Sequence, residues 1–164
     1  MDNIPKYISN FIKFIGTNSA WLNLCLVILI CFDVLQRYLF NQTYNAVLEL
    51  EWHFFGLIFL LGSAYTLQVD KHVRVDILYS KMSEKNKAII DAMGSLILLV
   101  PWCIVGIITC YKYASNSLYI HESSPNPGGL PAWFIIKFVI VLCFILILLQ
   151  GIINIIQKMK LIVR

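Results

Sequence analysis

Ionisable side chains occur at helical spacing inside two strongly apolar stretches of this sequence. Asp33 and Arg37 are four residues apart in the first stretch, and Glu49 and His53 are four apart in the second. Residues at this spacing share one helix face, and a charge inside a bilayer is costly unless it is paired or faces protein. Such groups could pair helices, or they could couple a proton or cation with Asp33 as the acid. Because Arg37 lies one turn from Asp33, we favour a structural ion pair.

Other kinds of chemistry have little support in the sequence. It holds no nucleophile–base motif, phosphate-binding loop or metal-spaced cluster, so we expect no enzyme activity and no metal. A haem would need two histidines facing each other at one depth. Only His53 and His121 fall near the same side, and His121 lies in an expected loop. The five cysteines are all in apolar stretches without a C-x-x-C pair, which predicts packing residues.

Composition identifies the chain as an integral membrane protein. Its 164 residues are 59% hydrophobic with a mean hydropathy of +0.76, more apolar surface than a soluble domain of this size could bury. The net charge of +4 does not indicate nucleic acid, because the basic residues flank apolar stretches. We predict a single all-α membrane domain over residues 1–164. Its four transmembrane helices should cover about residues 20–40, 46–69, 87–118 and 132–156.

Lysine and arginine counts in the flanking segments predict how the chain is oriented. Five lie within 70–87 and three in the tail after residue 156, whereas the 41–48 and 119–131 loops have none. The positive-inside rule then places both termini and the middle loop in the cytoplasm. Residues 1–18 have apolar side chains at helical spacing. They are either an amphipathic helix on the membrane surface or the first turns of span one.

Local signals refine these spans. Ser83 is expected to cap the third helix, which at roughly 45 Å is longer than a bilayer is thick and should bend at Pro101. Gly62 and Thr66 form a small-x-x-x-small pair that would let another helix approach closely. Lys137, one turn inside span four, is a candidate counter-charge for Glu49 or Asp33.

Five short pieces of the chain occur in a recognisable order. They are Gln36-Arg37-Tyr38 with Phe40, the acidic entrance Glu49 to Trp52, Gly62 with Ala64, Asp70-Lys71-His72-Val73-Arg74-Val75-Asp76, and Leu130-Pro131. With the length and the four spans, this order resembles the small membrane subunit (DctQ type) of the tripartite ATP-independent periplasmic, or TRAP, transporters. The resemblance covers nearly the whole chain.

The resemblance implies a non-catalytic role without a cofactor, in the inner membrane of a bacterium. In this family a larger multi-span membrane subunit carries the substrate and sodium ions. A soluble periplasmic binding protein delivers an organic anion, such as a C4-dicarboxylate or a sialic acid. The small subunit would scaffold the larger one, help dock the binding protein and otherwise contact membrane lipid.

Three groups of residues are the candidates for these roles. Those expected at the contact with the larger subunit are Asp33, Arg37, Tyr38, Glu49, Trp52, His53, Gly62, Thr66 and Lys137. Those that match the cytoplasmic motif are Asp70, His72, Arg74 and Asp76. Those expected to help dock the binding protein are Asn41, Tyr44, His121, Glu122 and Asn126.

Three other functions stay open at this point. A self-contained small four-helix exporter would use Asp33 as its coupling acid and transport without partners. A haem-bearing membrane anchor of a redox enzyme would use the histidines. A plain assembly factor would be dispensable once a transporter had been assembled.

Overall fold

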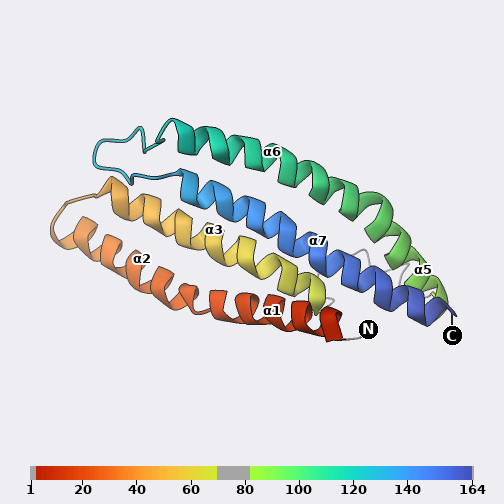
Figure 1. The fold of residues 1–164 in the computed structure, drawn as a ribbon. Coiled ribbons are helices and arrows are strands. Elements are labelled where there is room, and N and C mark those ends of the chain that lie inside the picture. Colours follow the sequence, from red (N-terminus) through yellow and green to blue (C-terminus); the bar gives the residue numbers. More distant parts are fainter. Residues whose placement is uncertain (1–2, 70–81, 164) are drawn as a thin grey trace.

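The computed structural model describes residues 3–69 and 82–163, and this part of the chain is built of helices joined by turns and loops. Figure 1 shows long helices lying side by side, with α7 between α3 and α6, and with α1 and α2 end to end along α3. The helices are α1 (Asn3–Ser19), α2 (Leu22–Leu39), α3 (Asn45–Gln68), α5 (Glu84–Gly94), the π-helical turn η1 (Ser95–Leu99), α6 (Val100–Tyr119) and α7 (Phe134–Val163).

Four helical segments in the described part are long and apolar enough to cross a membrane. They run over Pro5–Leu39, Asn45–Gln68, Glu84–Tyr119 and Phe134–Ile162. The prediction of an all-α protein with four spans is therefore confirmed. The turn at 40–44 and the loop at 120–133 lie together at one end of the bundle, which we call the loop end (Figure 1). The start of α1 and the end of α7 lie at the other end, which we call the terminal end.

The first and last spans extend furthest beyond their predicted limits. The first begins near residue 5 rather than 20, because α1 continues the line of α2 after a turn at residues 20–21. The last helix runs to Val163, seven residues beyond the predicted end. The hydropathy of the central apolar run sets the predicted limits, whereas the actual helices continue into more polar sequence that packs against its neighbours.

Helix α1 packs against α3 and α7 rather than standing alone. Ile12 is buried against Ala64 and Leu146, and the neighbouring Ile8 and Ile15 pack on the same cluster. The helix predicted for residues 1–18 is confirmed from residue 3 onwards, and the side that carries Ile8, Ile12 and Ile15 is turned towards the bundle, whereas Phe11 is 55% exposed. Gly16 permits the contact, because a Cβ built there would lie 2.8 Å from Cγ of Tyr65 and closer still to its Cβ.

A π-helical turn interrupts the third span. Ser83 caps α5 as predicted, its hydroxyl accepting from the N–H of Asn86 at 3.3 Å. At Ser95 the pattern changes, and Val100 donates its backbone N–H to the Ser95 carbonyl, five residues back. Pro101 follows directly and has no N–H to donate. The irregularity predicted at Pro101 is therefore present, as a π turn just before the proline, and the α5–α6 helix curves along α7 (Figure 1).

The terminal end of α7 is tied to α5 by an ion pair. Lys158 Nζ lies 2.7 Å from a carboxylate oxygen of Asp91. The four residues of the expected cytoplasmic motif, Asp70, His72, Arg74 and Asp76, lie outside the described residues. The side of the membrane on which each end lies stays a prediction.

Candidate functional site

The most elaborate polar structure in the described chain is at the loop end, where Glu49 binds the loop that follows α6. Glu49 is one turn inside α3 and only 4% exposed. Its Oε1 accepts from the Ser124 hydroxyl and from Nδ2 of Asn126 at 3.0 Å. Its Oε2 accepts from the backbone N–H of Leu130 at 2.7 Å. One carboxylate thus joins three points of the loop to α3, and we call this arrangement the Glu49 clamp.

The loop is also closed by bonds within itself. The Ser124 N–H donates to the Leu130 carbonyl and the Gly129 N–H to the Asn126 carbonyl, both at 3.0 Å. The Ser124 hydroxyl in turn accepts from the Asn126 N–H at 3.0 Å. These bonds leave no space for a side chain at 129, where a Cβ would lie 2.8 Å from Glu49 Oε1 and still closer to Ser124. Gly128 has a φ of +71°, a conformation that favours glycine.

The turn between α2 and α3 is joined to the same loop. Nδ2 of Asn45, at the start of α3, donates to the Pro127 carbonyl at 2.9 Å. Tyr44 donates its hydroxyl to Gln42 Oε1 at 2.5 Å within the turn. The two connections at the loop end therefore form one continuous surface. Proline and glycine content predicted that residues 119–131 are not regular helix, and only Tyr119 of that range belongs to a helix.

Lys137 does not pair with Glu49 or Asp33, so that prediction was wrong. Its Nζ lies 2.5 Å from Glu122 Oε2 and 4.0 Å from the centre of the Tyr113 ring. Lys137 is only 6% exposed, and this contact joins α7 to the loop and to α6. The sequence places Lys137 near the start of span four, as the structure does, but the partner is set by how the loop returns over α7.

The Lys137 contact lowers the pKa of Glu122. Lys137 donates to the carboxylate, and the pKa falls below its ordinary value of about 4.5. A group with a lowered pKa in the folded state stabilises that state above its ordinary pKa, and the effect is lost as pH falls through the lowered value.

We therefore expect protection of the loop from proteases to fall as pH drops below about 4.5. Limited proteolysis between pH 6 and 3 with an acid-tolerant protease measures this loss. The Glu122→Gln variant keeps the shape of the side chain without its charge, so its loop should change less steeply over the same range. Equal pH dependence in both proteins would contradict the assignment.

Aromatic rings flank the Glu49 clamp. Trp52 meets Trp133 edge to face with ring centres 5.6 Å apart, and it lies against His53 at 3.9 Å. Nδ1 of His53 lies 2.6 Å from the Glu49 carbonyl oxygen, so this nitrogen carries the proton and donates. His53 is thus bonded to the backbone one turn back, not to the Glu49 carboxylate.

The predicted pair of Asp33 and Arg37 is confirmed. Arg37 donates to the Asp33 carboxylate, with side chains 50% and 5% exposed, respectively. The pair lies on α2, apart from the contacts of Glu49 and Lys137. Oε1 of Glu51, on the adjacent α3, is buried and has no hydrogen-bond partner among the described residues.

The remaining candidate residues divide by exposure. Asn41, Tyr44 and His121 are exposed at the loop end, and Asn41 and His121 have positive φ values of 52° and 48°. Asn126 directs its amide into the clamp, and Glu122 is half-buried. Arg37, Tyr38 and Trp52 are exposed.

Three of the residues predicted at the subunit contact have partners inside this chain, and their place at that contact stays a prediction. Asp33, Glu49 and Lys137 are each at most 6% exposed and are satisfied by the contacts given above. Gly62 has no neighbouring atom within 4 Å of where a Cβ would lie, and Thr66 donates its hydroxyl to the Gly62 carbonyl at 2.9 Å. Within the described chain no other helix uses this pair for close approach.

Sequence reasoning missed the residues that complete the clamp. Ser124 and Gly129 were recognised only as parts of a Pro/Gly-rich loop, and Tyr113 was not singled out. A Ser-x-Asn sequence before two glycines is a turn signal, but it does not indicate the carboxylate that it binds. Among residues 3–69 and 82–163 there is no group of three or more His, Cys, Asp or Glu side chains that could hold a metal ion.

The loop end is therefore a surface ordered by hydrogen bonds and ion pairs within the chain. None of the curated proteins compared with the chain matches it. Among known protein families, residues 26–161 match the one described as tripartite ATP-independent periplasmic transporters, DctQ component. This match spans α2 to α7 and most of the chain, and it agrees with the four apolar spans. The chain belongs to the DctQ family, the small membrane component of TRAP transporters.

Proposed function

We propose that this chain is the non-catalytic scaffold of a sodium-coupled TRAP transporter for organic anions, and that its loop end helps to dock the periplasmic binding protein. The observation that carries the docking role is the Glu49 clamp. It holds the loop at 120–131 in one arrangement through hydrogen bonds to a buried carboxylate. A surface ordered before it meets its partner loses less conformational entropy on binding.

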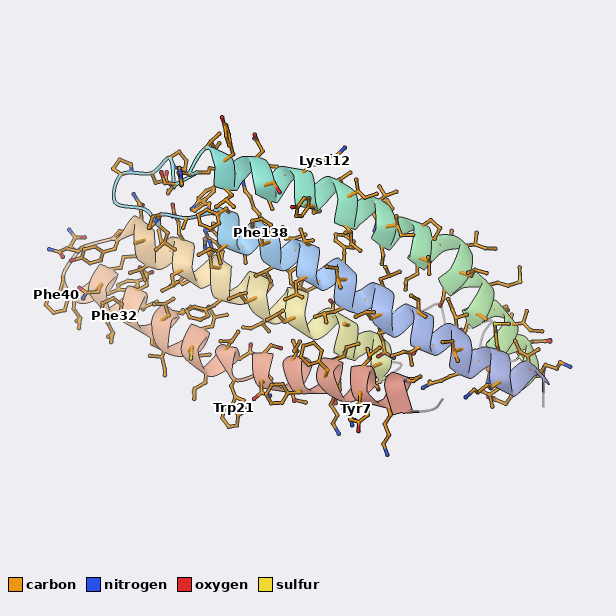
Figure 2. The ribbon with its side chains drawn as sticks, viewed as in Figure 1. Tyr7, Trp21, Phe32, Phe40, Lys112 and Phe138 are labelled. Atoms are coloured by element: carbon orange, nitrogen blue, oxygen red, sulfur yellow. The ribbon has the colours of Figure 1, made fainter. Side chains whose placement is uncertain are left out.

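The scaffold role is supported by how little of the apolar surface is covered within the chain. In the most apolar 18-residue window of each span, between 6% and 33% of the residues are buried. Large apolar side chains on α2 and α6 are turned outwards, and Figure 2 shows Phe32 pointing away from the bundle. Lipid covers such surface in a membrane, and so would a larger membrane subunit.

Substrate and ion binding are assigned to that larger subunit. In this chain Asp33, the acid that a self-contained exporter would need, is bonded to Arg37 on the same helix. That pairing favours a structural role for Asp33. The proposed substrate is an organic anion of the C4-dicarboxylate or sialic acid class. The proposed location is the bacterial inner membrane, with both termini cytoplasmic and the loop end in the periplasm.

Purification from native membranes tests this function. The tagged chain is extracted in mild detergent, and the proteins that accompany it are identified by mass spectrometry, with an absorbance scan of the same sample. A large multi-span protein in fixed ratio without a Soret band is expected. A chain that purifies alone or as a homodimer would overturn the proposal, and a Soret band would favour the redox anchor.

Gly62 offers a probe of the contact with the larger subunit. A Gly62→Leu change fills the open side of α3, where no atom of the described chain lies within 4 Å. If a partner helix approaches there, recovery of the large subunit should fall several-fold, while the melting temperature of the isolated chain stays unchanged. Gly94→Leu is the matched control, since Gly94 is equally open but lies on α5. Full recovery with Gly62→Leu would exclude this face as the contact.

A further inference from the structure

A groove of about 260 Å³ opens between α1 and α7 at the terminal end of the bundle. Its polar lining comes from Lys6, Ser9 and Asn10 on α1, and from Gln157 and Lys160 on α7. Its apolar lining comes from Pro5, Ile153 and Ile156. The groove is far from the Glu49 clamp, and the scaffold and docking roles make no use of it.

On the α7 wall, the polar and apolar parts of the groove follow the direction of the helix. Along α7, Ile153 and Ile156 come before Gln157 and Lys160, so the apolar part lies nearer the middle of the span. One helix rises about 1.5 Å per residue, so this change takes place over about 10 Å. Because α1 begins where α7 ends (Figure 1), Lys6 lies at the same end as Lys160. The α7 wall of the groove is thus cationic towards the end of the bundle and apolar towards the middle of the span, and Lys6 adds a second cation at that same end, with the polar Ser9 and Asn10 about one turn further inwards on α1.

Several contacts hold the α1 wall of the groove in place. Gln68, the last residue of α3, donates through Nε2 to the Ser9 carbonyl at 3.1 Å and also to the Ser9 hydroxyl. That hydroxyl keeps its own proton for a further acceptor. Ile12, one turn further along α1, is 1% exposed in the core. The groove is therefore a fixed feature of the packed bundle and not a gap beside a loose terminus.

We propose that this groove binds an anionic phospholipid, with the headgroup phosphate between Lys6 and Lys160 and an acyl chain along the exposed Ile156, above the buried Ile153. The two ammonium groups supply the charge that a phosphate needs, and Ser9, Asn10 and Gln157 supply neutral hydrogen-bond donors. A lipid is the only part of a membrane with this order of anionic head and apolar tail. Basic sites between spans at a membrane surface are a common form of headgroup recognition.

The test uses the full-length chain together with any membrane partner that co-purifies, after delipidation. The probes are dioleoyl phosphatidylglycerol, dioleoyl phosphatidylcholine with the same acyl chains, and inorganic phosphate. Native mass spectrometry counts bound lipid, and a titration gives its affinity. We expect phosphatidylglycerol to bind in preference to phosphatidylcholine, and inorganic phosphate at equal concentration not to displace it.

Substitutions then place the lipid in this groove. The Lys6→Gln/Lys160→Gln variant should bind phosphatidylglycerol about 30-fold more weakly, roughly fivefold for each charge lost near the surface. Lys13→Gln/Lys85→Gln removes the same charge from exposed positions that do not line the groove, and it should bind like the wild type. Lys6→Arg/Lys160→Arg should restore most of the affinity, which a purely structural role of the lysines would not predict.

Three results would overturn the proposal. They are equal affinity in the groove and control variants, equal binding of the two lipids, and displacement by inorganic phosphate alone. If the double variant does not fold, the single Lys6→Gln change at an exposed residue decides the matter, with about a fivefold loss expected. Co-purification of the large subunit is a separate readout, so a negative lipid result leaves the proposed function standing.

Discussion

Replacing Glu49 with alanine is expected to release the loop at 120–131 from α3 and to abolish recruitment of the binding protein. The change removes the acceptor of three hydrogen bonds, from Ser124, Asn126 and the Leu130 N–H. Hydrogen bonds to a charged group are stronger than neutral ones, and a buried donor left without an acceptor is itself unfavourable. We expect the Leu130 amide to exchange with deuterium roughly tenfold faster or more, because each 1.4 kcal/mol of lost protection is a factor of ten.

Two measurements and one control define this experiment. Hydrogen–deuterium exchange reports the loop, and capture of the binding protein by the purified membrane complex reports the docking function. Glu51→Gln is the matched control, since Glu51 is two residues away on α3 and its Oε1 has no hydrogen-bond partner among the described residues. If the Glu49→Ala complex captures the binding protein normally although its loop exchanges faster, docking does not depend on an ordered loop. The main support for the docking role would then be lost.

Replacing Gly16 with valine should destabilise the chain more than any change at an exposed glycine. A Cβ at Gly16 would lie 2.8 Å from Cγ of Tyr65 and closer to its Cβ, atoms that cannot move without α3. The two helices must separate, which disturbs the buried contacts of Ile12 with Ala64 and Leu146. Overpacking of this kind costs about 1–3 kcal/mol, which lowers the melting temperature in detergent by several degrees.

The control for this experiment adds a Cβ where the structure has space. Gly62→Ala lies in the middle of α3 with no atom within 4 Å of the new methyl group. Alanine also favours helix over glycine by about 1 kcal/mol, so the melting temperature should stay the same or rise. A Gly16→Val protein that melts like Gly62→Ala would mean that α1 does not pack on α3 as described.

The helices themselves follow from local sequence. Hydropathy places α3 within a residue of its predicted limits, because that span is bounded by polar turns on both sides. It fails at the start of span one, where Lys6 and Lys13 lower the average although α1 is helical and packed. Contacts with α3 and α7 decide the structure there, and they come from residues about 50 and 135 positions further along the chain.

The candidate site was less accessible to sequence reasoning. The pair of Asp33 and Arg37 is found correctly, because i, i+4 spacing fixes both residues on one helix. The partners of Glu49 lie 75 to 81 residues away, on a loop whose path depends on how α6 and α7 pack. Lys137 therefore received the wrong partner, although its place near the start of the last helix was predicted correctly. To predict which charged residues pair across the bundle, the loop conformation must be known, and the spacing of residues in the sequence does not give it.

The π turn at Ser95–Leu99 changes which face of the third span points towards α7. The Val100 N–H bonds to the carbonyl five residues back instead of four, so one extra residue is inserted into the helix. Each residue of an α-helix turns by about 100°, so the helix faces after the π turn are offset by about that angle. The two halves of the third span can therefore meet α7 at different azimuths. Asp91 points to Lys158 on one side of the offset, and Gly106 receives the Phe144 ring on the other. The stretch from Glu84 to Tyr119 therefore packs on α7 as two helical segments with different orientations, and each segment contacts its own section of α7.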